Sequence, residues 1–310
     1  MSCRSLAGSS AIVLAALAAA SSATAQVPPP ELVIEGPIDA IGANSITVMG
    51  IEINVPSGRA DTPTVVGVPL NSLNDPLPGR SQGFVGGTAI VTGGSTGGVV
   101  TATEVFSDVN ENVVVGEVTS NDPLTVDHLP VVRSTSPVIP GSAPMNVFGF
   151  QIDEKTVAAG SLISIEGYLG SENGTRQLFY HTLEADTGDP VNRSSNEVSV
   201  TRTQCRDRAD ASKDELEVQG WVHRAGLPNL IGTLPAITIT HPALTTGRTP
   251  TKTTGTATIV PVVDPASPQY AQYRYRSSNR NLDGCPLRIK VSWQGDVDSA
   301  VSEVDVDAAP

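Results

Sequence analysis

The residues best spaced for chemistry form one glycine-rich stretch, Thr92-Gly93-Gly94-Ser95-Thr96-Gly97-Gly98. Its glycines are typical of a loop that holds the phosphates of a dinucleotide. Its centre also fits the pattern G-x-S-x-G, in which a nucleophilic serine lies on a sharp turn of a hydrolase. Both kinds of site require a helix directly after the turn, because the helix N-terminus binds phosphate and the hydrolase turn joins a strand to a helix.

The residues that follow this stretch favour a strand over a helix. The run Val99-Val100-Thr101-Ala102-Thr103-Glu104-Val105 is rich in β-branched side chains, which pack well on a pleated sheet. The stretch resembles the opening of a short-chain dehydrogenase over a short segment, but no Tyr-x-x-x-Lys pair follows it. We therefore predict a hairpin of strand, glycine turn and strand, with neither a nucleotide site nor a serine nucleophile.

The histidines and carboxylates show no local spacing of a metal or catalytic site. No H-x-H or H-x-x-x-H pair occurs among His128, His181, His223 and His241. A zinc site or a Ser-His-Asp site assembled from distant parts of the chain remains an open alternative. We predict no catalytic residue, no cofactor-binding residue, no metal ligand and no cofactor.

The cysteines indicate one disulfide. The chain has three cysteines, of which Cys3 lies in the N-terminal segment considered next, so that Cys205 and Cys285 remain as a pair. Paired cysteines in an exported protein are usually oxidised to a disulfide. A metal site or a catalytic thiol pair is the alternative, but no further His or Cys lies near either residue.

Residues 1–25 have the order of features of a signal peptide. Arg4 precedes an apolar run at residues 11–20, and Ala23-Thr24-Ala25 fits a cleavage site. The apolar run is shorter than the roughly 20 residues that span a bilayer. We expect a mature chain with no membrane span that begins with a Pro-rich segment, residues 26–30, and is exported to the periplasm or the outside of the cell.

The net charge of the chain limits the classes of molecule that it is expected to bind. The chain carries a formal net charge of -13. Proteins that bind nucleic acid neutralise phosphates with basic patches, and no such patch is visible in this sequence. We expect no nucleic-acid partner, and we expect a glycan or another protein of the cell envelope instead.

Composition and periodicity indicate an all-β protein. Short β-branched segments alternate with turns rich in glycine and proline, and no convincing helical period follows residue 26. Residues 31–107 and 112–186 share an order of strands and turns that indicates an internal repeat, with chance similarity as the alternative. A polar linker is expected at 187–204. Residues 205–308 carry short strands and the cysteine pair, which predicts an immunoglobulin-like β-sandwich.

The first two units resemble bacterial exported proteins of unknown function built from OB-like β-barrel repeats. The resemblance rests on Gly36-x-Ile38, on Ser45-Ile46-Thr47-Val48-x-Gly50 and on Gly87-x-x-Ile90-Val91-x-Gly93. The second copy departs from it, with Asp127 and His128 in place of Met49 and Gly50. The C-terminal third resembles sandwich modules that are appended to such proteins. The resemblance implies two small OB-like barrels followed by a sandwich, and no particular chemistry.

Two classes of function follow. The first is a non-catalytic protein of the cell envelope or extracellular space with a binding or scaffolding role, since OB-like barrels bind oligonucleotides or oligosaccharides on a sheet face and its loops. The second is a secreted hydrolase whose active site is built from the long loops. We favour the first, because no compact catalytic motif is present.

Overall fold

The computed structural model describes residues 32–109, 112–191, 196–208, 214–223, 234–241, 255–265, 267–277, 285–293 and 300–309. The expected signal peptide at 1–25 and Pro-rich segment at 26–30 lie outside these residues. The predicted all-β class is confirmed, since strands interrupted by two short 3₁₀ helices account for the regular structure of the described residues. Among them, no helix is long and apolar enough to cross a membrane.

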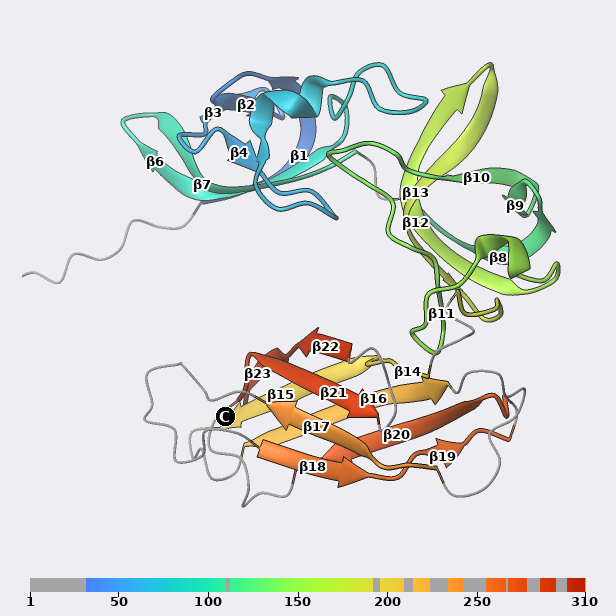
Figure 1. Ribbon diagram of the computed structural model, residues 1–310. Coiled ribbons are helices and arrows are strands. Elements are labelled where there is room, and N and C mark those ends of the chain that lie inside the picture. Colours follow the sequence, from blue (N-terminus) through green and yellow to red (C-terminus); the bar gives the residue numbers. More distant parts are fainter. Residues whose placement is uncertain are drawn as a thin grey trace, which may run out of the picture.

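The first unit, called the first barrel below, is a closed five-stranded barrel with the order β1-β2-β3-β7-β6 (Figure 1). Strands β3 and β7 pair in parallel, and the other neighbours are antiparallel. Alternate residues such as Ile46, Val48 and Ile53 are fully buried inside it. Its strands are β1 (Leu32–Ile41), β2 (Ser45–Val48), β3 (Ile51–Asn54), β6 (Thr88–Thr96) and β7 (Val99–Asp108), and the excursion between β3 and β6 carries β4 (Arg59–Ala60), β5 (Val68–Pro69) and η1 (Leu70–Asn74).

The second unit is a six-stranded sheet with the order β10-β9-β8-β12-β13-β11. A further parallel pairing joins β10 to β13, strands that lie far apart along that order. The elements of the second unit are β8 (Asn112–Asn121), β9 (Leu124–Val126), β10 (Leu129–Arg133), β11 (Met145–Asn146), η2 (Glu154–Thr156), β12 (Leu162–Glu172) and β13 (Thr175–Ala185).

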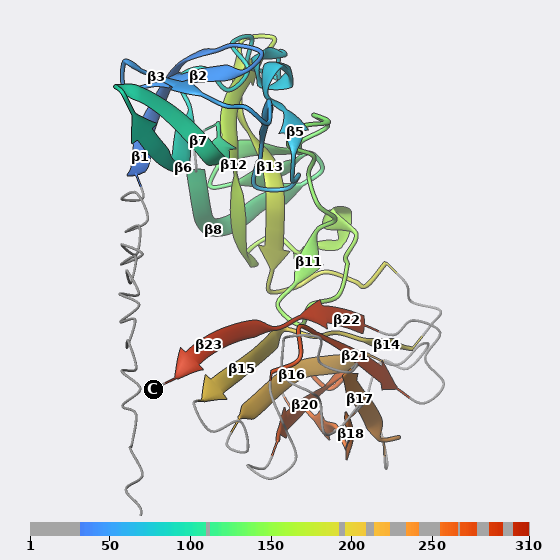
Figure 2. The same cartoon turned by 90° about the vertical axis from the view of Figure 1, so that its left-hand side faces the viewer.

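The long β12–β13 hairpin belongs to two cores. Its base contributes Ile163, Ile165 and Leu183 to the core of the second unit. Towards its tip, Tyr168 and Phe179 are buried in the core of the first barrel. Figures 1 and 2 show this hairpin reaching from the second unit to the side of the first barrel. The two units are therefore joined through apolar packing and not only through the chain.

The third unit consists of two sheets that share one apolar core. One has the order β19-β20-β16-β15-β23 with β14 also on β16, and the other has the order β18-β17-β21-β22. The sulfur atoms of Cys205 and Cys285 are 2.01 Å apart, so the predicted disulfide is present. The strands are β14 (Glu197–Val198), β15 (Arg202–Arg208), β16 (Glu215–His223), β17 (Ile237–His241), β18 (Gly255–Ile259), β19 (Val262–Val263), β20 (Tyr270–Arg276), β21 (Arg288–Trp293), β22 (Ala300–Glu303) and β23 (Asp305–Ala309).

Part of the predicted linker belongs to this third unit. Within residues 187–204, Glu197 and Val198 form β14 and pair with His223 and Val222 of β16, and β15 begins at Arg202. The partners of Glu197 and Val198 on β16 lie more than twenty positions away in sequence. From Glu197 onward, it is therefore part of the sheet.

An aromatic cluster connects the second and third units. Phe148, in the loop after β11, stacks on Tyr270 with ring centroids 4.0 Å apart and forms a T-shaped pair with Trp221, with ring centroids 4.8 Å apart. His223 lies 5.6 Å from Tyr270, and burial lowers the pKa of this histidine. Burial likewise raises the pKa of Tyr270 to about 12, so both rings are uncharged at neutral pH. The cluster is thus an apolar joint between the units.

Candidate functional site

The glycine-rich stretch is a hairpin, as predicted. Strand β6 ends at Thr96, β7 begins at Val99, and these two residues are paired across the turn. Gly97 and Gly98 form the turn with φ angles of 60° and 83°, a left-handed conformation that glycine adopts without a steric cost. The helix that either enzymatic interpretation requires is replaced by β7.

Gly93 and Gly94 have different roles within this hairpin. The register of β6 against β7 shifts between Thr92 and Gly93, which marks a bulge. A Cβ atom on Gly93 would lie 2.1 Å from the carbonyl oxygen of Thr101, which is backbone of the facing strand. A Cβ atom on Gly94 would meet nothing within 4 Å. The first glycine is therefore needed for close packing of the barrel, and the second is not.

This difference gives a matched pair of variants. We expect Gly93→Ala to lower the free energy of unfolding by about 2–3 kcal/mol, because the backbone must move to admit the methyl group. We expect Gly94→Ala to leave it unchanged or raise it by about 0.5 kcal/mol, since alanine restricts the unfolded chain more than glycine does. Urea unfolding followed by far-UV circular dichroism measures both. Equal losses in the two variants would contradict this assignment.

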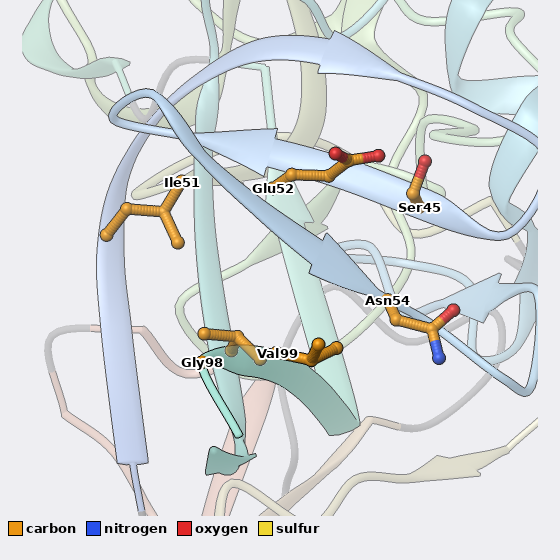
Figure 3. A pocket seen from close by; sticks show the side chains of 7 residues that line it. Ser45, Ile51, Glu52, Asn54, Gly98 and Val99 are labelled. Carbon is orange, nitrogen blue, oxygen red and sulfur yellow. The ribbon is translucent and has the colours of Figure 1, made fainter. Parts of the chain in front are cut away.

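The outer face of the same hairpin borders an open cleft of about 450 Å³ on the first barrel. One wall is formed by β2 and β3 through Ser45, Glu52 and Asn54, and the other by the hairpin tip through Gly98 and Val99. Figure 3 shows Ser45 and Glu52 on neighbouring strands, with Asn54 further along β3 towards the hairpin. On the hairpin side, Gly98 adds no side chain to the cleft, and Val99 and Val100 line it beside this glycine.

Strand periodicity places the polar residues of the cleft outside the barrel. Ser45 is paired with Asn54, while their neighbours Ile46 and Ile53 are paired and fully buried. The β2–β3 turn is tight, and its Gly50 N–H donates to the carboxylate of Asp39 at 2.6 Å. The parallel pairing of β3 with β7 then places the hairpin tip beside Asn54. The cleft is therefore built on rigid, paired strands.

The cleft offers polar groups and exposed apolar surface together. Its polar atoms are the Ser45 hydroxyl, the Glu52 carboxylate and the Asn54 amide, which can accept and donate hydrogen bonds. Ile51 and Val99 are 40% and 59% exposed and lie at its border. The described residues that line it include one carboxylate and no Lys or Arg. Such a surface suits an uncharged ligand that carries both hydroxyl groups and C–H faces.

Sequence reasoning identified only the cysteine pair as special, and it missed the residues of the cleft. The available signal was the alternation in residues 45–54, which places Ser45, Glu52 and Asn54 outward but does not show what faces them. The four histidines lie on separate elements: His128 in the β9–β10 turn, His181 on β13, His223 on β16 and His241 on β17. In the described part of the chain, no group of three His, Cys, Asp or Glu residues could hold a metal ion.

No protein-family model matches this chain, and no curated protein or solved structure is significantly similar to it. The assignment of a function therefore depends on the geometry of the cleft and on the barrel that carries it.

Proposed function

We propose that this chain is an exported, non-catalytic β-module protein that binds a neutral oligosaccharide in the cleft between β2–β3 and the β6–β7 hairpin. The proposal depends chiefly on one observation, the position of the cleft at β2, β3 and the β6–β7 turn of the first barrel. The periplasm or the extracellular space is its place of action, in line with the signal-like residues 1–25. The ligand is then a glycan of the envelope or its surroundings.

Strand order supports the proposal that the first barrel is OB-like. Its five strands pair in the order first, second, third, fifth, fourth, and the fifth closes on the third in parallel. OB-like barrels bind oligonucleotides and oligosaccharides on the face of their second and third strands and on the loop between the fourth and fifth. In this chain those elements are β2, β3 and the β6–β7 turn, which line the cleft.

Details of the second unit support the proposal of an internal duplication. Its strands β8-β9-β10-β13-β12 repeat the same pairing order, with β10 and β13 in parallel. The second-to-third turns have left-handed residues in both units, Met49 and Gly50 in one and Asp127 and His128 in the other. In the second unit, the corresponding hairpin packs against the first barrel through Tyr168 and Phe179, while its tip at residues 171–176 is exposed. The two copies thus differ in what surrounds this hairpin.

The chemistry of the cleft favours a neutral sugar over the other ligands of such barrels. Nucleic acid is disfavoured, because Glu52 would face a phosphate backbone in a chain of net charge -13. Hydrolysis of a glycoside usually needs two carboxyl groups flanking the bond, and Glu52 is the one carboxylate among the described lining residues. These features support binding without turnover.

In this proposal, the third unit is a structural domain that holds the ligand-binding first barrel in position. Its two sheets over a shared core, with a disulfide to β15, support the proposal of an immunoglobulin-like sandwich. Together with the two barrels, this arrangement supports membership in the bacterial exported proteins that the sequence resembles. We assign the third unit a scaffolding role that presents the first barrel to its ligand.

A panel of neutral oligosaccharides, tested by thermal shift and then by isothermal titration calorimetry, examines this proposal. We expect saturable binding without release of a product. Asn54→Ala should weaken binding about tenfold, which is the loss of one good hydrogen bond to a sugar hydroxyl. Glu52→Gln should also weaken binding, because a neutral amide oxygen replaces a charged acceptor. Glu117→Gln, the same change at an exposed site of β8, is the matched control and should bind as the wild type does.

Two results would overturn the proposal. The first is the absence of binding by any neutral glycan in the panel. The second is binding that the Asn54 and Glu52 variants leave unchanged, which would place the ligand elsewhere. Turnover of a bound glycan that is lost in Glu52→Gln would instead assign the cleft to a hydrolase.

A further inference from the structure

A second cleft, of about 390 Å³, lies where the first barrel meets the tip of the β12–β13 hairpin. The loop at residues 79–82 forms one side and the hairpin residues 169–171 and 176 form the other. It shares no lining residue with the cleft at β2–β3. Its side chains differ in kind as well, because two arginines, Arg80 and Arg176, line it.

The two guanidinium groups form no ion pair within the described part of the protein. Arg80 donates from Nε to the carbonyl oxygen of Gly83 at 2.7 Å and from Nη2 to that of Val85 at 2.6 Å. These carbonyls fix its orientation and carry no charge. Arg176 is exposed, and neither arginine forms an ion pair with a described carboxylate. The neighbouring Glu172 accepts a hydrogen bond from Gln177 instead.

The backbone holds the two sides of this cleft together. The N–H of Ser171 donates to the carbonyl oxygen of Gly79 at 2.8 Å. Gly79 has φ +66°, and a Cβ atom there would lie 2.8 Å from the Ser171 nitrogen. Gly170 is packed as closely, since its Cβ would lie 2.9 Å from the oxygen of Gly79. The backbone segments that carry Arg80 and Arg176 are therefore joined before any ligand arrives, and the side chain of Arg80 is held by its two carbonyl partners.

We propose that this cleft binds an oxyanion, namely a carboxylate, sulfate or phosphate group. Guanidinium groups bind such groups through paired, charge-assisted hydrogen bonds. The hydroxyl of Ser81 and the amide of Gln82 lie in the same cleft and add neutral donors. Two unpaired cations in a chain of net charge -13 make this a local positive site on an acidic protein. The oxyanion is either a free inorganic ion or the acidic group of a charged sugar.

Two probes distinguish these sources: inorganic phosphate and an oligogalacturonide, titrated at constant ionic strength into the full-length mature protein. Calorimetry gives the affinity, and ¹H–¹⁵N spectra locate the site through the amides of Ser81, Gly170 and Ser171. We expect saturable binding of at least one probe, weakened by added salt. Tighter binding of the oligogalacturonide assigns the site to an acidic glycan, and tighter binding of phosphate assigns it to a free ion.

Arg176→Gln is the decisive variant, because Arg176 is exposed and we expect its substitution to leave the fold intact. We expect it to weaken binding of the preferred probe at least tenfold, and Arg176→Lys to restore part of that loss. Lys290→Gln, which removes one positive charge from β21 in the third unit, is the matched control and should bind normally. If the wild type binds neither probe, or if the Arg176→Gln and Lys290→Gln variants bind equally, the proposal is wrong.

Discussion

Phe179→Ala is expected to lower the free energy of unfolding by about 3–5 kcal/mol and to separate the melting of the first barrel from that of the second unit. Phe179 is 1% exposed, and its ring stacks on Tyr168 with centroids 5.3 Å apart. Although β13 belongs to the second unit, this ring lies in the core of the first barrel. Truncation leaves a cavity where the two units meet, so the apolar coupling between them is lost. Differential scanning calorimetry measures this as a split of one cooperative transition into two.

The preceding residue supplies the control. Leu178 is fully buried but belongs to the core of the second unit. We expect Leu178→Ala to destabilise that unit by about 2–5 kcal/mol while the two units continue to melt together. The third unit and its joint with the second unit are followed by fluorescence, because both tryptophans lie in the third unit and Trp221 contacts Phe148. The same calorimetric profile in both variants would show that Phe179 does not couple the units.

Local features of the sequence were sufficient to predict the hairpin at residues 88–108. The turn needs two residues with left-handed φ, which Gly97 and Gly98 provide, and the flanking segments are β-branched. These preferences act within a few residues, so they can be read without knowledge of the rest of the fold. The same holds for the all-β class, which follows from many such segments.

The shared core could not be predicted from the sequence. Alternation in β12 and β13 indicates that Tyr168 and Phe179 are buried, but it does not indicate against which unit. That depends on how far the hairpin extends past the core of the second unit and on the glycine contact at Gly79. Both are tertiary features, and they join the second unit to the core of the first barrel.

For the cleft at β2–β3, likewise, one part could be predicted from local sequence patterns and the other part could not. The outward positions of Ser45, Glu52 and Asn54 follow from strand periodicity. The second wall exists because β3 pairs in parallel with β7, which is about fifty positions later in the chain. No local pattern specifies this pairing, so the site residues were not identified before the fold was known. Residues 197–198 were predicted as linker for the same reason, since their partners on β16 lie more than twenty positions away.

Loss of the Cys205–Cys285 disulfide is expected to lower the stability of the third unit by about 4–5 kcal/mol. The bridge joins residues 80 positions apart, and in the chain-entropy model a closed loop of this length restricts the unfolded chain by that amount. Cys205 is fully buried on β15, so the variant Cys205→Ala/Cys285→Ala also loses two buried sulfur atoms. Urea unfolding measured by tryptophan fluorescence reports on this unit and on its joint with the second unit, because both tryptophans belong to the third unit and Trp221 contacts Phe148.

Comparison with chemical reduction separates the crosslink from the substitutions. Dithiothreitol should lower the unfolding midpoint of the wild type to nearly that of the double variant, and it should leave the variant unchanged. The first barrel and the second unit contain neither cysteine, so their calorimetric transition should stay in place. A wild-type midpoint that does not respond to reduction would mean that the crosslink restricts the unfolded chain far less than its length predicts. A shift in all transitions together would mean that the aromatic joint at Phe148 and Tyr270 makes the three units unfold as one.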